Sequence, residues 1–157
     1  EQCNWEWREW GEVESVYRLM AHRVHRELRE NKKDMQLNEI TGIIIEEAIE
    51  VHKELGPGLL ESVYEEALYF CLKERGLKVE RQKAIPVLFK GIKLEQGFRA
   101  DLIVEDIVIV ELKSQETIPP VHYKKLLTYL RLSSSKVGLL INFYEELLKN
   151  GIKRIIN

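Results

Sequence analysis

Residues 99–113 read Arg99-Ala-Asp101-Leu-Ile-Val-Glu-Asp-Ile-Val-Ile-Val-Glu111-Leu-Lys113, and this stretch decides the fold. Two apolar runs flank an acidic pair, which predicts two strands of a covered, central sheet joined by a tight turn. If residues 105–107 form that turn, Asp101 lies directly across from Glu111, and Arg99 lies across from Lys113. A two-residue turn would shift this register by one and separate the charges.

Because side chains alternate along a strand, this register places Asp101, Glu111 and Lys113 on one face, which Ile103 and Ile109 continue toward the turn. Directly opposed Cβ atoms lie about 4.5–5.5 Å apart, so the two carboxylates repel unless a cation lies between them. Hard oxygen ligands favour Mg²⁺ or Mn²⁺. The alternative is a solvated hairpin face with an ordinary salt bridge. The other face is entirely apolar: Ala100, Leu102, Val104, Val108, Val110 and Leu112.

Outward from this hairpin, spacing and turn residues predict a single α/β domain over residues 35–157. Asn38 is expected to cap a helix that Gly56-Pro57-Gly58 ends. A second helix is predicted at 60–75 and a third at 121–132. The predicted fold is a central mixed sheet of four or five strands, flanked by helices, in the order α-α-β-β-β-α-β. The expected strands are 79–90, 98–104, 107–113, 136–143 and 152–156, with a short helix near 145–150.

Residues 1–34 differ from the rest and are expected to form an N-terminal appendage. All three tryptophans lie within the first eleven residues, and apolar residues at helical spacing then predict one amphipathic helix over 12–33. We expect this helix to anchor a partner protein or a second copy of the chain.

Bulk composition is that of a soluble globular protein, with 157 residues, 45% hydrophobic and 32% charged. No apolar run approaches the roughly 18–20 residues that cross a bilayer, and no basic-then-apolar segment opens the chain. A cytoplasmic location without membrane contact is the expectation. Cys3 and Cys71 have no CxxC partner, which makes a zinc site improbable. A net charge of −2 does not indicate a nucleic-acid partner, but it is compatible with a local basic surface.

The pattern Asp101…Glu111-Leu112-Lys113 resembles the motif of the PD-(D/E)XK nuclease superfamily, with Arg-Ala before the aspartate where proline often stands. Residues 38–157 more specifically resemble its GxxExxY group. The naming motif reads Gly58-Leu-Leu-Glu61-Ser-Val-Tyr64. Two further stretches resemble that group, Glu50-Val-His-Lys-Glu-Leu-Gly-Pro-Gly58 and Gly138-Leu-Leu-Ile-Asn-Phe143.

The resemblance implies metal-assisted hydrolysis of phosphodiester bonds, with DNA as the expected substrate. Asp101, Glu111 and the backbone carbonyl of Leu112 would hold Mg²⁺ or Mn²⁺. Lys113 would orient the attacking water and stabilise charge on the phosphate, and Glu61 would be a further acidic group. One departure affects activity. Related nucleases often have Gln-x-x-x-Tyr on the following helix, where this chain has Lys125-Leu-Leu-Thr-Tyr129.

Other residues are predicted to support the site. Tyr64 is expected to pack in the core, with its hydroxyl near Glu61, and His122 is expected to border the site. His52 is expected at a helix surface or end. Two clusters of basic residues are candidates to contact the phosphates of a nucleic acid. The first is Lys124, Lys125, Arg131 and Lys136, and the second is Lys78, Arg81, Lys83, Lys90, Lys93 and Arg99.

Two alternatives remain open from the sequence. The first is a relative that binds nucleic acid without cutting it. The second is an interaction or scaffold module that docks through residues 12–33.

Overall fold

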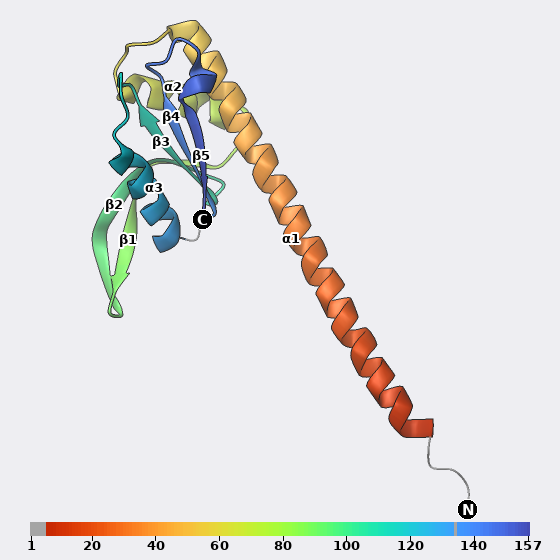
Figure 1. Ribbon diagram of the computed structural model, residues 1–157. Helices are drawn as coiled ribbons and strands as arrows, with labels where there is room; N and C mark the ends of the chain where they lie inside the picture. The colour runs from red at the N-terminus through yellow and green to blue at the C-terminus, as the bar shows by residue number, and fades with distance from the viewer. Residues whose placement is uncertain (1–5, 134) are drawn as a thin grey trace, which may run out of the picture. The chain divides into compact units, whose positions relative to one another are not determined.

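The computed structural model describes residues 6–133 and 135–157, and its elements follow the predicted order (Figure 1). Over these residues the sheet has five strands in the order β1-β2-β3-β4-β5, antiparallel except for the parallel pair β3–β4. The prediction of a mixed α/β fold is confirmed. The helices are α1 (Glu6–Leu55), α2 (Glu61–Glu74), α3 (Pro120–Leu132) and the short 3-10 helix η1 (Leu148–Gly151). The strands are β1 (Val79–Phe89), β2 (Ile92–Val104), β3 (Val108–Lys113), β4 (Val137–Asn142) and β5 (Ile152–Ile156).

The β2–β3 hairpin has the predicted register. Val104 pairs with Val108, and Leu102 pairs with Val110. In the turn, the Ile107 N–H donates to the Val104 carbonyl at 3.1 Å, and Glu105 and Asp106 both have positive φ. Positive φ at two central residues fits the right-handed twist of the flanking strands.

The regular pairing of β2 with β3 extends from the turn to Leu102 and Val110. Asp101 is the next residue of β2 away from the turn. There the Asp101 Oδ2 atom accepts the Leu112 backbone N–H at 2.8 Å, so a side chain takes the place of a strand partner. Ala100 belongs to the same core cluster as Ile103 and Ile109, although strict alternation would place it on the opposite face. The predicted face for Ala100 is therefore wrong, because the alternation is interrupted at Asp101.

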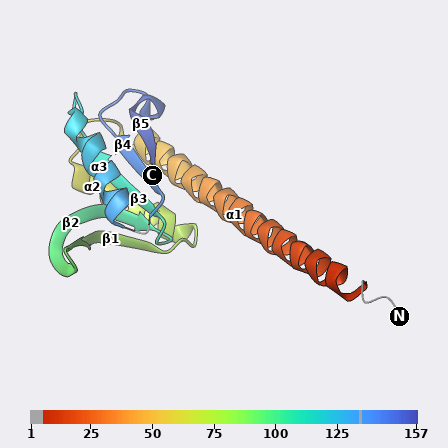
Figure 2. The ribbon, with the colours of Figure 1, turned by 60° about the horizontal axis from the view of Figure 1, so that its bottom comes forward.

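Two helices cover opposite faces of the sheet (Figures 1 and 2). Helix α3 contacts β1, β4 and β5, and its Leu126, Tyr129 and Leu130 join the cluster around Ile103 and Ile109, which are buried core residues. Helix α2 contacts β1, β2 and β3. Gly138 of β4 is needed under α3, because a Cβ atom there would lie 2.8 Å from the Leu126 side chain.

Helix α1 is one continuous helix, so the predicted end near residues 30–33 and the cap at Asn38 are wrong. Between residues 12 and 56 there is no proline, and residues 29–36 contain mostly good helix formers, so a capping residue alone does not start a new helix. The chain divides into two compact units, residues 1–38 and 39–157, and α1 belongs to both.

Predictions that concern Trp5 fall outside the described residues, as do those on the side chains of Trp7 and Trp10. In the second unit, α1 buries Ile40, Ile44, Ala48 and Val51, and Leu55 near its end is 39% exposed. None of the described helices has the length and apolarity needed to span a membrane.

Candidate metal centre

Asp101 and Glu111 form an acidic pair where β2 and β3 separate. Burial is the main cause that raises the pKa of Glu111 from its ordinary 4.5 to about 7, and the charge of Asp101 raises it further. The charges of Lys113 and Lys125 and the Asp101 backbone N–H act in the opposite direction. Burial beside the Asp101 carboxylate therefore disfavours the charged form of Glu111.

Two buried side-chain oxygen atoms have no partner among the described residues, and both belong to predicted site residues: Glu111 Oε1 and the Tyr129 hydroxyl. A buried acceptor without a donor is costly unless a ligand or water satisfies it. The carboxylate donor set and the unpartnered Glu111 oxygen therefore fit a hard divalent cation.

Within residues 6–133 and 135–157, no three His, Cys, Asp or Glu side chains group closely enough to hold a metal ion. An ion between Asp101 and Glu111 would need further ligands from the backbone, water or substrate, as Mg²⁺ commonly does. The predicted backbone ligand, the Leu112 carbonyl, accepts a hydrogen bond from Lys113 Nζ at 3.0 Å. A cation at that oxygen would replace the ammonium.

Lys113 ends β3 with its side chain only 13% exposed. Its Nζ atom lies between the Leu112 carbonyl and Glu61 Oε2, the latter at 3.6 Å. Its own carbonyl accepts the Phe143 N–H at 2.7 Å, which fixes the strand end against the residue after β4. The ammonium is thus held at the acidic pair by groups on both sides.

Glu61 stands at the first turn of α2, where negative charge is favoured. Its Oε1 atom accepts the Ser114 N–H at 3.2 Å, and the Ser114 hydroxyl donates to the Leu59 carbonyl at 2.8 Å. Glu61 therefore connects α2 to Lys113 and to the segment that follows it. The structure brings Glu61 to the site as predicted, but as a partner of Lys113.

Tyr64 is fully buried and stacks on Phe143 with ring centroids 4.2 Å apart. Its hydroxyl donates to the Gly56 carbonyl at 2.6 Å and accepts the Leu59 N–H at 3.0 Å. The predicted support of Glu61 by this hydroxyl is wrong, because the hydroxyl holds the loop between α1 and α2.

Removing this hydroxyl by Tyr64→Phe is expected to lower the free energy of unfolding by about 1 kcal/mol, because two backbone groups lose a partner. Urea unfolding at pH 7 measures the change. Tyr144→Phe is the matched control, since Tyr144 is 44% exposed. Equal stabilities of the two variants would show that the loop does not depend on this hydroxyl.

Helix α3 carries one lysine, Lys125, whose charge acts on the acidic pair. Lys125 lowers the pKa of Glu111, and its Nζ lies 5.5 Å from the Tyr129 ring centroid. Tyr129 itself is a core residue, 4% exposed and stacked on Phe98. His122 is half-buried in the first turn of α3 and Lys124 is exposed. Among the described residues, no recorded hydrogen bond or ion pair joins either of them to the acidic pair.

The second predicted basic group is largely neutralised. Lys78 and Lys83 pair with Asp106, Arg81 pairs with Glu65, and Lys93 pairs with Glu95. Arg99 is exposed, and the regular pairing of β2 with β3 covers only residues 102–104 and 108–110. The predicted pairing of Arg99 with Lys113 is therefore wrong.

Several polar residues make contacts that the sequence pattern does not predict. His52 lies in the last turn of α1, one of its two predicted positions, but is only 8% exposed, with Nε2 2.7 Å from the Glu145 carbonyl. Asn142, 3% exposed, donates to the Gln115 carbonyl at 2.8 Å and accepts the Gln115 N–H at 3.1 Å. It fixes the chain just after Lys113. Gln82 donates to Asp101 Oδ1 and also to Glu65 Oε2.

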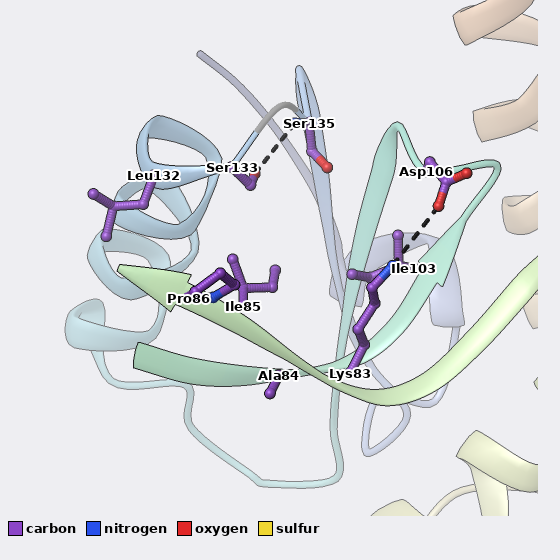
Figure 3. A pocket seen from close by; sticks show the side chains of 9 residues that line it. All are labelled: Lys83, Ala84, Ile85, Pro86, Ile103, Asp106, Leu132, Ser133 and Ser135. Atoms are coloured by element: carbon purple, nitrogen blue, oxygen red, sulfur yellow. Dashed lines mark hydrogen bonds and ion pairs between the residues drawn. The ribbon is translucent and has the colours of Figure 1, made fainter. Parts of the chain in front are cut away.

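The second unit contains several pockets, and two of them differ in their relation to this centre. One of about 550 Å³ adjoins the site through Glu61 and Ser114, and exposed Leu60 and Tyr144 also line it. The other, of about 250 Å³, is lined by Lys83 and Asp106, which form an ion pair (Figure 3). Of the residues predicted to contact nucleic acid or metal, Lys83 lines this second pocket, whereas Glu61 lines the first.

Residues 38–155 match a family model, which is described as the PD-(D/E)XK nuclease superfamily. No curated protein and no solved structure matched the chain.

Proposed function

The chain belongs to the PD-(D/E)XK nuclease superfamily, and on that basis we propose that it is a Mg²⁺- or Mn²⁺-dependent nuclease that hydrolyses phosphodiester bonds of DNA. The observation that carries the proposal is the buried, unpartnered Glu111 oxygen beside Asp101. We also propose membership of the GxxExxY group, on Gly58, Glu61 and Tyr64.

Each residue of the centre has a role in this proposal. Asp101, Glu111 and the Leu112 carbonyl would hold the cation, which would supply Lewis-acid polarisation and a more acidic water. The Lys113 ammonium would bind the scissile phosphate as a point charge. Glu61 keeps the Lys113 ammonium aimed at that position. Lys125, in place of glutamine, provides a second phosphate contact.

We propose that the nuclease domain is residues 35–157 and that residues 1–34 are an appendage for a partner protein or a second copy. The family match begins at residue 38 and the second compact unit at residue 39, which supports a boundary in this region. A chain beginning at Met35 should keep the cleavage activity and change its assembly state in sedimentation.

The function is tested with the full chain on panels of DNA and RNA, with and without Mg²⁺ or Mn²⁺. We expect cleavage that requires the ion, and an Asp101→Asn variant that binds Mn²⁺ at least about tenfold more weakly in calorimetry. Asp106→Asn, an exposed aspartate in the adjacent turn, is the matched control. Intact substrates in every panel would overturn the proposal. DNA binding without cleavage, with Mn²⁺ affinity unchanged in Asp101→Asn, would instead indicate a non-catalytic nucleic-acid-binding relative.

A further inference from the structure

We propose that Gln82, anchored by the buried Glu65, is a positioning residue that sets the orientation of the Asp101 carboxylate. The inference rests on the proposed function only in taking Asp101 as a metal ligand. It assigns a role to two residues outside the motif that carried the family resemblance.

The Gln82 side-chain amide bridges two carboxylates. Its Nε2 atom donates to Glu65 Oε2 at 2.6 Å and to Asp101 Oδ1 at 3.3 Å. An amide nitrogen carries two hydrogen atoms, so one group can serve both acceptors. The shorter bond is to Glu65, which makes Glu65 the anchor and Asp101 the group that is positioned.

Glu65 is suited to be an anchor because it is 7% exposed and both of its oxygen atoms are bonded. The second oxygen, Oε1, accepts the Arg81 Nε–H at 2.9 Å. A buried carboxylate is tolerated only when it is paired in this way, and a side chain held so has little freedom to move. Glu65 lies one helical turn after Glu61 on α2, so the same helix supports both Lys113 and Asp101.

The backbone of Gln82 is unusual for a strand. Its φ is 49°, in the left-handed region that a glutamine rarely adopts. The neighbours Arg81 and Lys83 keep their regular pairing with β2, so the distortion is confined to the position that faces Asp101. Strained backbone of this kind persists where the surroundings impose it and is frequent at functional sites. Here it accompanies an amide directed between Glu65 and Asp101.

The consequence for Asp101 is that both oxygen atoms have a fixed donor. Oδ2 accepts the Leu112 N–H at 2.8 Å, and Oδ1 accepts the Gln82 amide. Both donors are neutral, so the carboxylate is oriented without being neutralised and each oxygen keeps a lone pair for a cation. A lysine or arginine at position 82 would compete with that cation. Partners of this kind change metal affinity by about 10–100-fold when removed.

The decisive variant is Gln82→Asn. Asparagine keeps the amide and tolerates positive φ better than most residues, but its shorter side chain cannot bridge Glu65 and Asp101. The dissociation constant for Mn²⁺ is measured by calorimetry on the full chain at pH 8, together with urea unfolding and, on DNA, KM and kcat. We expect the Mn²⁺ Kd to rise about 10–100-fold, with stability unchanged or increased. Gln82→Ala should weaken Mn²⁺ binding equally, and Glu65→Gln should weaken it in the same direction.

Gln36→Ala, an exposed glutamine on α1, is the control and should bind Mn²⁺ like the wild type. If Gln82→Asn binds Mn²⁺ as tightly as the wild type, Gln82 does not position Asp101 and the inference is wrong, whatever the cleavage assay shows. If Gln82→Asn loses stability without losing affinity, Gln82 has a purely structural role, which also overturns it. If the wild type itself binds no Mn²⁺, the metal centre of the proposed function fails, and the inference fails with it.

Discussion

Replacing Lys113 by alanine is expected to lower kcat/KM for DNA cleavage by about 10²–10³-fold, the usual cost of removing one donor that stabilises transition-state charge. The Lys113 side chain is 13% exposed, and its ammonium is fixed between the Leu112 carbonyl and Glu61. Water cannot easily replace it in that position. The rate is measured with excess Mg²⁺ on a labelled DNA oligonucleotide.

The loss should appear in the rate more than in metal affinity. Because the charge of Lys113 also lowers the pKa of Glu111, removing Lys113 raises that pKa, so affinity for Mn²⁺ is compared over a series of pH values rather than at one pH. Lys113→Arg keeps the charge but not the compact geometry, so we expect only partial activity. Lys153→Ala, an exposed lysine on β5, is the matched control. Cleavage by Lys113→Ala within a few fold of the wild type would remove Lys113 from the chemistry.

The hairpin that holds these groups is predictable from the sequence because its pattern is local. The apolar runs on both sides of Glu105 and Asp106 predict two strands joined by a tight turn, and a three-residue turn sets the register. That register predicts the proximity of Asp101 and Glu111. The strand and helix boundaries around it follow from Gly56, Gly76 and Pro120, which interrupt regular structure locally.

The residues that support the hairpin are not predictable in this way, since their contacts are between distant segments. The sequence alone predicts that Glu65 is a solvated helix residue. The structure shows that it is bonded to Arg81 and Gln82. Positive φ at Gln82 has no composition signal, because glutamine is not a residue typical of that region. The continuity of α1 past Asn38 shows that a local signal can also predict a helix start that does not form. A capping residue indicates a start only when the preceding residues cannot themselves be helical.

The protonation of Glu111 predicts how the free energy of unfolding depends on pH. Its folded-state pKa of about 7 lies above the ordinary 4.5, so between these pH values the folded protein binds more protons than the unfolded chain. Without metal, the free energy of unfolding must therefore fall as the pH rises from about 4.5 to 7. Glu111→Gln removes this dependence, and it should be more stable than the wild type at pH 8 by up to about 3 kcal/mol, and not at pH 4. Urea unfolding at several pH values in EDTA measures the difference, with the exposed Glu116→Gln as control.

Divalent metal should reverse this order of stability. A cation binds the Glu111 carboxylate and competes with its proton, so Mn²⁺ affinity should increase as the pH rises toward 7, with close to one proton released per ion near pH 6. At pH 8, saturating Mn²⁺ should stabilise the wild type and leave Glu111→Gln nearly unchanged, because only the folded wild type has the ligand. If Mn²⁺ stabilises both proteins equally, Glu111 is not a ligand, and its buried charge needs another explanation. If neither protein responds to pH or to Mn²⁺, the acidic pair is not a metal centre.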